Sequence, residues 1–177
     1  DFRQLPDAAL LQATKDCVQT SLNALKLDCI PFYLTHRAEY KHYRDGIIWH
    51  CLRELQDEGL LQHLGASVGT DPDEARQYLA DSSVEMLQIP YNALDTRWVR
   101  SGVLTEAQEQ GVGVVTRSCY LQGLLLMGAH RVPRRLAYAR EYVERLESLA
   151  AELSLPVQEL AFRYVFSTST VHTTVLG

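Results

Sequence analysis

The sequence predicts an α/β fold built on a parallel sheet. Short apolar runs of strand length alternate along the chain with longer segments in which apolar residues recur every three or four positions. The segments between the strands are long enough to hold a helix, as connections between parallel strands require. With 177 residues, 46% of them hydrophobic, and no linker or internal repeat, we expect a single domain over residues 1–177.

The first elements surround the most informative stretch of the chain, residues 30–37. A helix is expected from about residue 6 to residue 26, because its apolar residues share one face. The apolar run that follows reads as a buried strand that ends on His36, and a charged, exposed loop is expected over residues 37–44. A second amphipathic helix is expected over residues 45–58.

The remaining elements repeat this alternation. Strands are expected at residues 61–68, 84–90, 111–117 and 170–176. Helices are expected in a segment that Asp71 and Pro72 open, and at residues 98–110, 136–153 and 156–166. In the helix over residues 136–153, the side chains expected to face inward are Tyr142, Val143, Leu146, Leu149 and Leu153.

Composition argues against several classes of partner. The formal charge of −5 and the lack of a Lys/Arg cluster on an aromatic-rich segment argue against nucleic acid and against anionic membranes. No apolar window approaches the roughly 20 residues of a membrane helix, and no signal-peptide pattern opens the sequence. The histidines show no metal-ligand spacing, so no metal site is expected.

The four cysteines indicate a cellular compartment. Cys17, Cys29, Cys51 and Cys119 are scattered, lie in apolar segments and form no C-x-x-C pair. Buried thiols in a reducing compartment are therefore expected, and with them a cytoplasmic location.

Two kinds of parallel sheet fit this pattern. An open doubly wound sheet suits the length, whereas a complete eight-stranded barrel typically takes about 250 residues. The chain carries neither G-x-G-x-x-G after a strand nor a P-loop, and these are the usual nucleotide motifs of open sheets. His36 would lie at the carboxyl end of its strand, where catalytic residues of parallel α/β folds gather, although a packing role is the alternative.

Several blocks of the sequence carry a resemblance that decides between these sheets. The blocks are residues 21–25, 32–37, 52–59, 64–67, 87–95, 111–118, 122–125 and 175–177. In order and spacing they resemble the aldo-keto reductases, and the most specific are Gln88-Ile-Pro-Tyr-Asn92 and the Arg117-Ser118 block that continues to Leu125. The resemblance implies a (β/α)8 TIM barrel that is incomplete here, with about five of its eight strands, from the helix before strand 4 to strand 8. It also implies reduction of aldehydes and ketones with NADPH.

The resemblance also assigns roles to residues. Of a catalytic Asp, Tyr, Lys and His, only the histidine has a counterpart here, which is His36; the other three belong to the portion before this chain. The implied cofactor-binding residues are Ser67 and Gln88 at the nicotinamide carboxamide, Arg117 stacked on its ring, and Ser118 and Gln122 at the pyrophosphate. Val68 stands where the family usually has asparagine, which puts one carboxamide contact in doubt. NADH stays open, because the segment that grips the 2′-phosphate would follow Gly177.

Other interpretations remain open at this stage. Gln88 could satisfy a buried backbone group, Arg117 could form a surface ion pair, and Ser67 could be a turn former. For the whole protein we weigh three hypotheses: a carbonyl reductase, a non-catalytic cofactor-binding or regulatory member or inactive fragment, and an unrelated barrel enzyme with His36 as general base. The partner would be a small carbonyl compound, and the oligomeric state is open. A partial barrel would need further segments or a partner to cover its open edges and interior.

Overall fold

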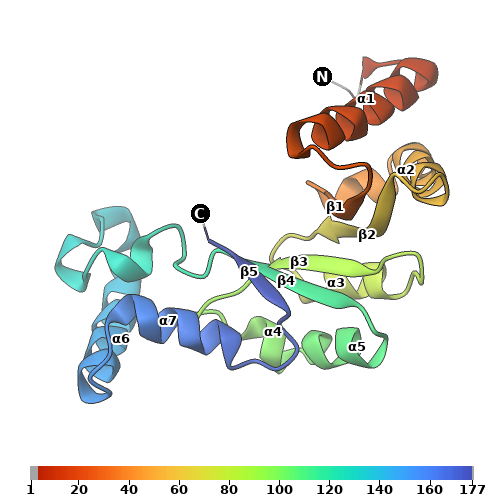
Figure 1. Cartoon of the computed structure of the whole chain (residues 1–177). Coiled ribbons are helices and arrows are strands. Elements are labelled where there is room, and N and C mark those ends of the chain that lie inside the picture. Colours follow the sequence, from red (N-terminus) through yellow and green to blue (C-terminus); the bar gives the residue numbers. More distant parts are fainter. Residues whose placement is uncertain (1–3, 177) are drawn as a thin grey trace. The chain divides into compact units, whose positions relative to one another are not determined.

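A computed structural model describes residues 4–176 (Figure 1). Within it the chain forms two compact units. The first unit reaches to Gln88, and the second begins at Ile89. The start of the expected polar lead-in, residues 1–3, and the last residue of the final family block, Gly177, lie outside the described residues. Each unit is described by itself, and a single domain over residues 1–177 stays a prediction.

The first unit alternates helices and strands as the sequence predicts. Its elements are α1 (Asp7–Leu25), β1 (Ile30–Thr35), the 3₁₀ helix η2 (Ala38–Lys41), α2 (Ile47–Asp57), β2 (Leu61–Ser67), α3 (Pro72–Leu79) and the first residues of β3 (Met86–Pro90). Helix α3 begins as the sequence suggests, because Asp71 accepts a hydrogen bond from the Asp73 N–H and Pro72 occupies the first turn.

The second unit contains the end of β3 and the remaining elements. These are α4 (Arg97–Arg100), α5 (Val103–Glu109), β4 (Gly113–Arg117), η3 (Leu124–Leu126), η4 (Ala129–Arg131), η5 (Arg134–Ala139), α6 (Arg140–Glu152), α7 (Val157–Phe166) and β5 (Thr173–Val175). The short 3₁₀ helices pack on α6 through a cluster of small and branched side chains, namely Leu124, Ala129, Val132, Ala139 and Val143.

The strands follow one another in the sheet in the order β1-β2-β3-β4-β5, with β3 shared between the units. The β1–β2, β2–β3 and β4–β5 pairings are parallel. In a doubly wound sheet the strand order reverses at a switch point, whereas in a (β/α)8 barrel it is sequential. The α/β class and the incomplete barrel that the sequence predicts are therefore confirmed.

Alternation along the strands of the first unit separates a covered face from an open one. Leu64, Ala66 and Leu87 are fully buried on the covered face. On the other face Phe32 is 53% exposed, and its ring stacks on His63 with centroids 5.5 Å apart. Gly65 lies on that open face, and a Cβ there would stand 2.2 Å from the Met86 carbonyl oxygen. The close approach of β2 and β3 therefore depends on glycine at this position.

The segment after β1 differs from the exposed loop that the sequence predicts there. Residues 37–44 are not an exposed loop, because η2 turns inward and buries Ala38 and Lys41. The Lys41 ammonium pairs with Asp81 and lies 5.6 Å from the Trp49 ring centroid and 5.7 Å from that of Tyr78. A lysine is buried here because a carboxylate and two ring faces replace its water.

Two of the predicted helices also differ from the structure. The helix expected over residues 98–110 is broken into α4 and α5 at Gly102, whose φ of +81° does not continue a helix. The helix expected over residues 136–153 begins at Arg140, after η5, in which Leu136 leaves helical geometry.

The inward face predicted for that second helix is only partly right. Val143 and Leu146 are buried, but Tyr142, Leu149 and Leu153 are 53%, 44% and 53% exposed. The buried side of α6 is rotated away from these three residues, because Val143, Leu146 and Ala150 carry the contact with the unit's core.

The cysteine prediction holds for two of the four thiols. Cys51 and Cys119 are buried, whereas Cys17 is exposed on α1 and Cys29 is half-buried, so the expectation was wrong for Cys17 and holds only partly for Cys29. Helix α1 turns its cysteine outward because Leu10, Val18 and Leu22 form its buried side. Among the described residues, no helix has both the length and the apolar character to cross a membrane.

Candidate functional site

His36 follows directly after β1 and is exposed. It lines a hollow of about 360 Å³ together with the β1 residues Tyr33 and Thr35, and α1 and α2 supply most of the apolar wall. Within residues 4–176, no hydrogen bond or ion pair involves the imidazole, so both ring nitrogens can meet a ligand. A ring nitrogen that carries a proton can donate to a carbonyl oxygen, as the predicted role requires.

Two neighbours of His36 give the hollow polar character that the sequence analysis missed. Thr35 Oγ1 is buried with no hydrogen-bond partner in the described part of the chain. Burial, with a smaller contribution from the Cys17 thiol, raises the pKa of Tyr33, so its hydroxyl is neutral. Tyr40 joins the lining from η2. Strand alternation would have paired Thr35 with Tyr33, but nothing in the sequence shows that η2 brings Tyr40 to the same hollow.

Ser67, the last residue of β2, and Gln88, in the middle of β3, lie side by side as register partners. The Ser67 hydroxyl donates to Gln88 Oε1 at 3.1 Å. This bond leaves the Gln88 amide nitrogen to donate outward and the Ser67 oxygen to accept. One donor beside one acceptor is the pattern that a carboxamide group can match with its own carbonyl and amino groups.

Val68, which stands where the family usually has asparagine, points away from this pair. Its side chain is 1% exposed, and its backbone N–H donates to the Gln88 carbonyl at 3.0 Å. The residue therefore holds β2 against β3 and offers no side-chain contact on the open face.

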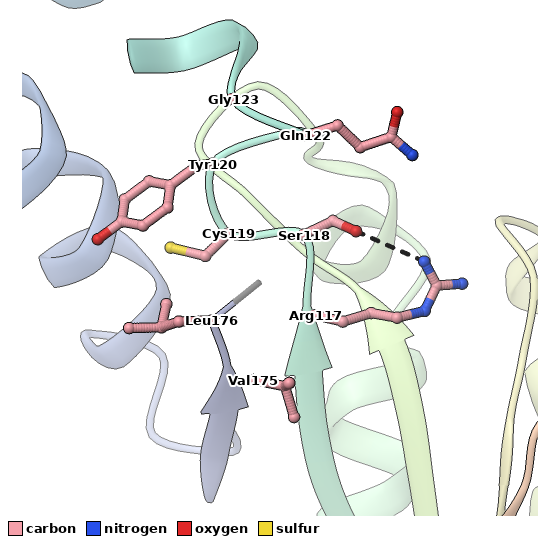
Figure 2. Close-up of a pocket in the computed structure, with 8 residues that line it drawn as sticks. All are labelled: Arg117, Ser118, Cys119, Tyr120, Gln122, Gly123, Val175 and Leu176. Carbon is pink, nitrogen blue, oxygen red and sulfur yellow. Dashed lines mark hydrogen bonds between the residues drawn. The ribbon is translucent and has the colours of Figure 1, made fainter.

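Arg117, Ser118 and Gln122 line a hollow of about 290 Å³ in the second unit (Figure 2). Cys119, Tyr120, Gly123, Val175 and Leu176 complete the lining. Arg117 donates to the Ser118 hydroxyl at 3.5 Å, and the Gln122 side chain extends away from the turn in Figure 2.

The turn between Arg117 and Gly123 is conformationally unusual. Ser118, Leu121 and Gln122 have positive φ angles of 61°, 48° and 53°. Left-handed backbone at residues other than glycine costs on the order of 1 kcal/mol each and is found where a loop is shaped around a ligand. A turn of this kind can hold an anion when its backbone N–H groups point outward, but here the Leu121 and Gly123 N–H groups donate to the Ser118 and Tyr120 carbonyls.

The structure thus brings Ser67 and Gln88 into contact and places Arg117, Ser118 and Gln122 around one hollow. The first pair and His36 belong to one unit and the other three residues to the second, so the roles predicted for all six remain predictions.

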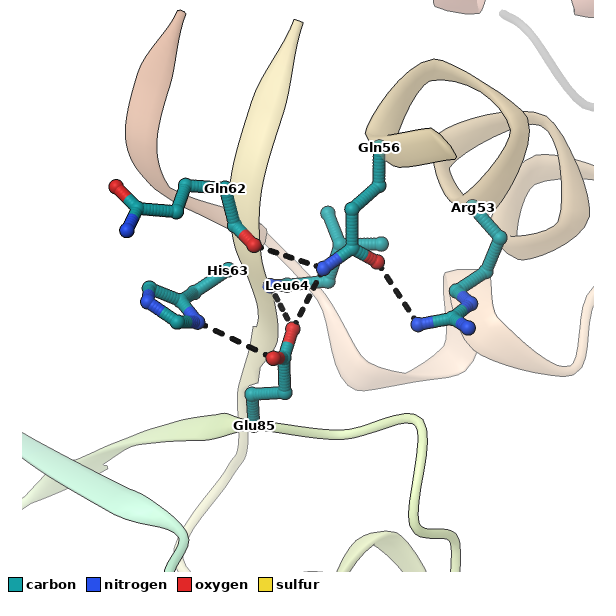
Figure 3. Close-up of polar contacts among 6 residues, drawn as sticks. All are labelled: Arg53, Gln56, Gln62, His63, Leu64 and Glu85. Atoms are coloured by element: carbon teal, nitrogen blue, oxygen red, sulfur yellow. Dashed lines mark hydrogen bonds and ion pairs between the residues drawn. The ribbon is translucent and has the colours of Figure 1, made fainter. Parts of the chain in front are cut away.

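Other residues singled out in the sequence have structural contacts. The Glu85 carboxylate accepts from the Leu64 N–H at 3.0 Å, from Gln56 at 2.7 Å and from His63 at 3.1 Å (Figure 3). Burial opposes ionisation here, but these hydrogen bonds outweigh it and lower the pKa of Glu85. The network joins α2 and β2 to the residue that precedes β3.

Elsewhere, the Tyr91 hydroxyl lies 2.9 Å from that of Thr168, and Asn92 Oδ1 accepts from the Leu94 N–H. These contacts give Tyr91 and Asn92 a structural role. Across residues 4–176, no three His, Cys, Asp or Glu side chains are grouped as a metal site would need.

Comparison with known proteins adds an independent line of evidence. The sequence model of the Aldo/keto reductase family matches residues 12–177. The aldo-keto reductase AKR11C1 from Bacillus halodurans in its holo form is 27% identical, with a TM-score of 0.69, 95% of this chain covered and 54% of that chain. Its apo form gives 25% identity, a TM-score of 0.72, and coverage of 94% and 58%.

The glycerol dehydrogenase AKR11B4 from Gluconobacter oxydans is 20% identical over 90% of this chain and 53% of its own, with a TM-score of 0.70, and shows the fold alone. No curated protein matches closely enough to count as a relative. The chain spans about half the length of the solved structures that it matches. Because the family match covers nearly the whole sequence and the strand order agrees with it, the chain belongs to the aldo/keto reductase family.

Proposed function

We propose that the protein containing this chain reduces aldehydes or ketones to alcohols with NADPH as hydride donor, NADH being the alternative. The observation that carries the proposal is the Ser67–Gln88 pair, which offers one acceptor and one donor on neighbouring strands. Both side chains are partly exposed, so a flat ligand can reach them. Family membership supports the reaction class.

In this proposal each residue has a separate task. Ser67 and Gln88 hold the carboxamide and so decide which face of the nicotinamide is presented. Arg117 stacks its planar guanidinium on the ring, as arginine does on aromatic groups. Ser118 and Gln122, on the turn after β4, receive the pyrophosphate with their polar side chains.

The bound nicotinamide supplies the hydride. As it is transferred, negative charge grows on the carbonyl oxygen of the substrate, and a donor held at that oxygen lowers the barrier. His36 has no partner among the described residues and can supply that hydrogen bond. The proton comes from an acid outside this chain, as the family resemblance implies, so the chain on its own is expected to bind cofactor without turnover. The substrate is a small carbonyl compound, and the site of action is the cytoplasm.

Titration of the chain with NADPH, followed through quenching of tryptophan fluorescence, tests cofactor binding. Gln88→Leu should weaken binding about tenfold, since a lost hydrogen-bond pair at this partly buried amide is worth roughly 1.4 kcal/mol. Gln62→Leu is the matched control, because Gln62 is an exposed glutamine on β2 whose side chain points away from Glu85 in Figure 3. Equal effects of the two substitutions would contradict the assignment of Gln88.

Turnover separates the reductase from a cofactor-binding relative without activity. The full-length protein, mixed with NADPH and an aromatic aldehyde, should oxidise the cofactor, as seen by its loss of absorbance. Binding without oxidation over a panel of aldehydes and ketones would favour the regulatory alternative.

A further inference from the structure

Helix α1 contributes a cysteine to the hollow beside His36. Side chains three or four residues apart lie on one side of a helix. The α1 residues that line the hollow follow this spacing, and they are Leu10, Ala13, Thr14 and Cys17. Cys17 is an exposed free cysteine, so it lies at the open side of the hollow, where a reagent can reach it. Because a cysteine thiolate is an intrinsically strong nucleophile, a molecule bound in the hollow can react with it.

The β1 side of the hollow carries a hydroxyl without a partner. Thr35 is 5% exposed, and its Oγ1 has no hydrogen-bond partner within residues 4–176. Side chains two positions apart on a strand share a face, so Thr35 and Tyr33 point the same way. Burial is the main cause of the raised pKa of Tyr33, and the nearby Cys17 thiol adds to it, which places this face of β1 toward Cys17. A ligand with an oxygen acceptor beside the thiol would satisfy the Thr35 hydroxyl.

The remaining walls of the hollow are mainly hydrocarbon. Its volume is about 360 Å³, and these walls are formed by Leu10 and Ala13 on α1 and by Ile48 and Leu52 on α2. Leu10, Ile48 and Leu52 are buried in the core of the first unit. An alkyl chain that leaves water to lie against them is stabilised by the hydrophobic effect. The hollow therefore suits a molecule that joins a thiol-reactive carbon and a carbonyl oxygen to an alkyl chain.

We propose that this hollow is a modification site, at which an α,β-unsaturated aldehyde with an alkyl chain adds covalently to Cys17. The Cys17 thiolate attacks the β-carbon, so that a carbon–sulfur bond forms and the electron pair of the carbon–carbon double bond moves toward the carbonyl oxygen. Thr35 donates a hydrogen bond to that oxygen and stabilises the enolate charge. The thiol releases its proton to water, and water returns a proton to the α-carbon. The sum is an addition without a leaving group, an oxidant or a reductant.

This reaction differs from the carbonyl reduction proposed above, because it needs neither a cofactor nor a hydride. Its product fills the hollow that His36 also lines. The modification can therefore be measured in the absence of NADPH, and its outcome does not depend on whether the protein is a reductase.

Mass spectrometry of the whole chain after treatment with hexenal or nonenal tests the proposal. The two aldehydes share the same reactive end and differ in the length of the alkyl chain. Each methylene group that enters the hollow should raise the rate roughly fourfold. Nonenal should therefore modify Cys17 at least about tenfold faster than hexenal, once each rate is divided by the rate with glutathione, and the rate should saturate with concentration. The tryptic peptide of residues 16–26 contains one thiol and no histidine, so its gain in mass reports Cys17.

A variant and an internal control separate binding from simple exposure of the thiol. Thr35→Val keeps nearly the same shape and removes a hydroxyl that has no partner in the described part of the chain, so folding should be retained. It should slow the reaction with nonenal several-fold and leave the reaction of Cys17 with iodoacetamide, which needs only an accessible thiol, unchanged. Cys29 is half-buried and does not line the hollow, so it should show no preference for the longer aldehyde.

Three results would overturn the proposal. Equal normalised rates with hexenal and nonenal would show an accessible thiol without a bound alkyl chain. A Thr35→Val variant that reacts with nonenal as fast as the wild type would remove the role of the hydroxyl. A Cys17 that reacts in the isolated chain but is protected in the full-length protein would show that another segment occupies the hollow.

Discussion

Replacing Lys41 by methionine should destabilise the first unit, because it removes the ion pair between Lys41 and Asp81. The ion pair, together with hydrogen bonds from Ser83, outweighs burial and lowers the pKa of Asp81 from 3.8 to about 2. By linkage, that difference corresponds to about 2.5 kcal/mol of folding free energy at neutral pH. Because the Asp81 side chain is 37% exposed and Ser83 supplies part of the effect, we expect Lys41→Met to cost only about 1 kcal/mol.

Removing the other partner should cost more. The Lys41 side chain is 5% exposed, so Asp81→Asn removes the charge that balances a buried ammonium and leaves it beside a neutral amide and the rings of Trp49 and Tyr78. Breaking a buried pair in this way typically costs about 3 kcal/mol or more. The hydrogen bond from the Ser83 N–H survives, because asparagine keeps an acceptor oxygen. The asymmetry between the two variants is therefore a consequence of unequal burial.

Urea unfolding followed by circular dichroism measures both costs, and its pH dependence gives a second check. The pKa of Asp81 is lower in the folded state, so the stabilisation is complete above the unfolded-state value near 4 and is lost as the pH falls through about 2. The difference between the wild type and Lys41→Met should disappear over that window. Arg163→Met, which breaks an exposed pair with Glu159 on α7, is the control and should cost a few tenths of a kcal/mol. The reasoning fails if Lys41→Met costs no more than this control, or if Asp81→Asn is the milder change.

Two further predictions concern backbone geometry and acid stability. Gly65→Ala should destabilise the chain by about 3 kcal/mol, because its Cβ would lie 2.2 Å from the Met86 carbonyl oxygen. Gly59→Ala should cost about 1 kcal/mol, because Gly59 has a φ of +81° but open space around it. Urea unfolding of both variants tests the contrast, and equal costs would contradict it. Glu85→Gln should remove part of the acid sensitivity of unfolding. The pKa of Glu85 is lowered in the folded state, so the stabilisation that its carboxylate gives the fold is lost as the pH falls below about 4.5. An unchanged acid transition would show that the contacts with His63 and Leu64 contribute nothing to stability.

Local patterns in the sequence predict most of the framework. The apolar runs that end at His36 and Ser67 are strands because their residues alternate between a covered and an open face, and each run stops where polar residues begin. The contact between Ser67 and Gln88 follows from the same alternation once β2 and β3 pair in parallel. The candidate site is predictable to this extent because strand ends meet at one edge of a sheet.

What the sequence does not show depends on contacts between distant segments. Lys41 reads as a surface residue, since its carboxylate partner lies 40 positions later and its aromatic neighbours lie in two other helices. The strained turn after Arg117 is equally hidden, because positive φ angles at Ser118 and Gln122 arise from the loop as a whole and not from glycine at those positions. Both features require knowledge of which segments pack together.

Helix α6 shows why an amphipathic pattern does not by itself identify the core. The sequence places apolar residues on two adjacent sides of this helix, and a periodicity count treats them as one inward face. The core of the second unit covers only the side that carries Val143, Leu146 and Ala150. The side that carries Tyr142, Leu149 and Leu153 stays about half-exposed. The periodicity of a helix therefore shows how its apolar residues are grouped around the axis, and only the packed unit shows which group is buried.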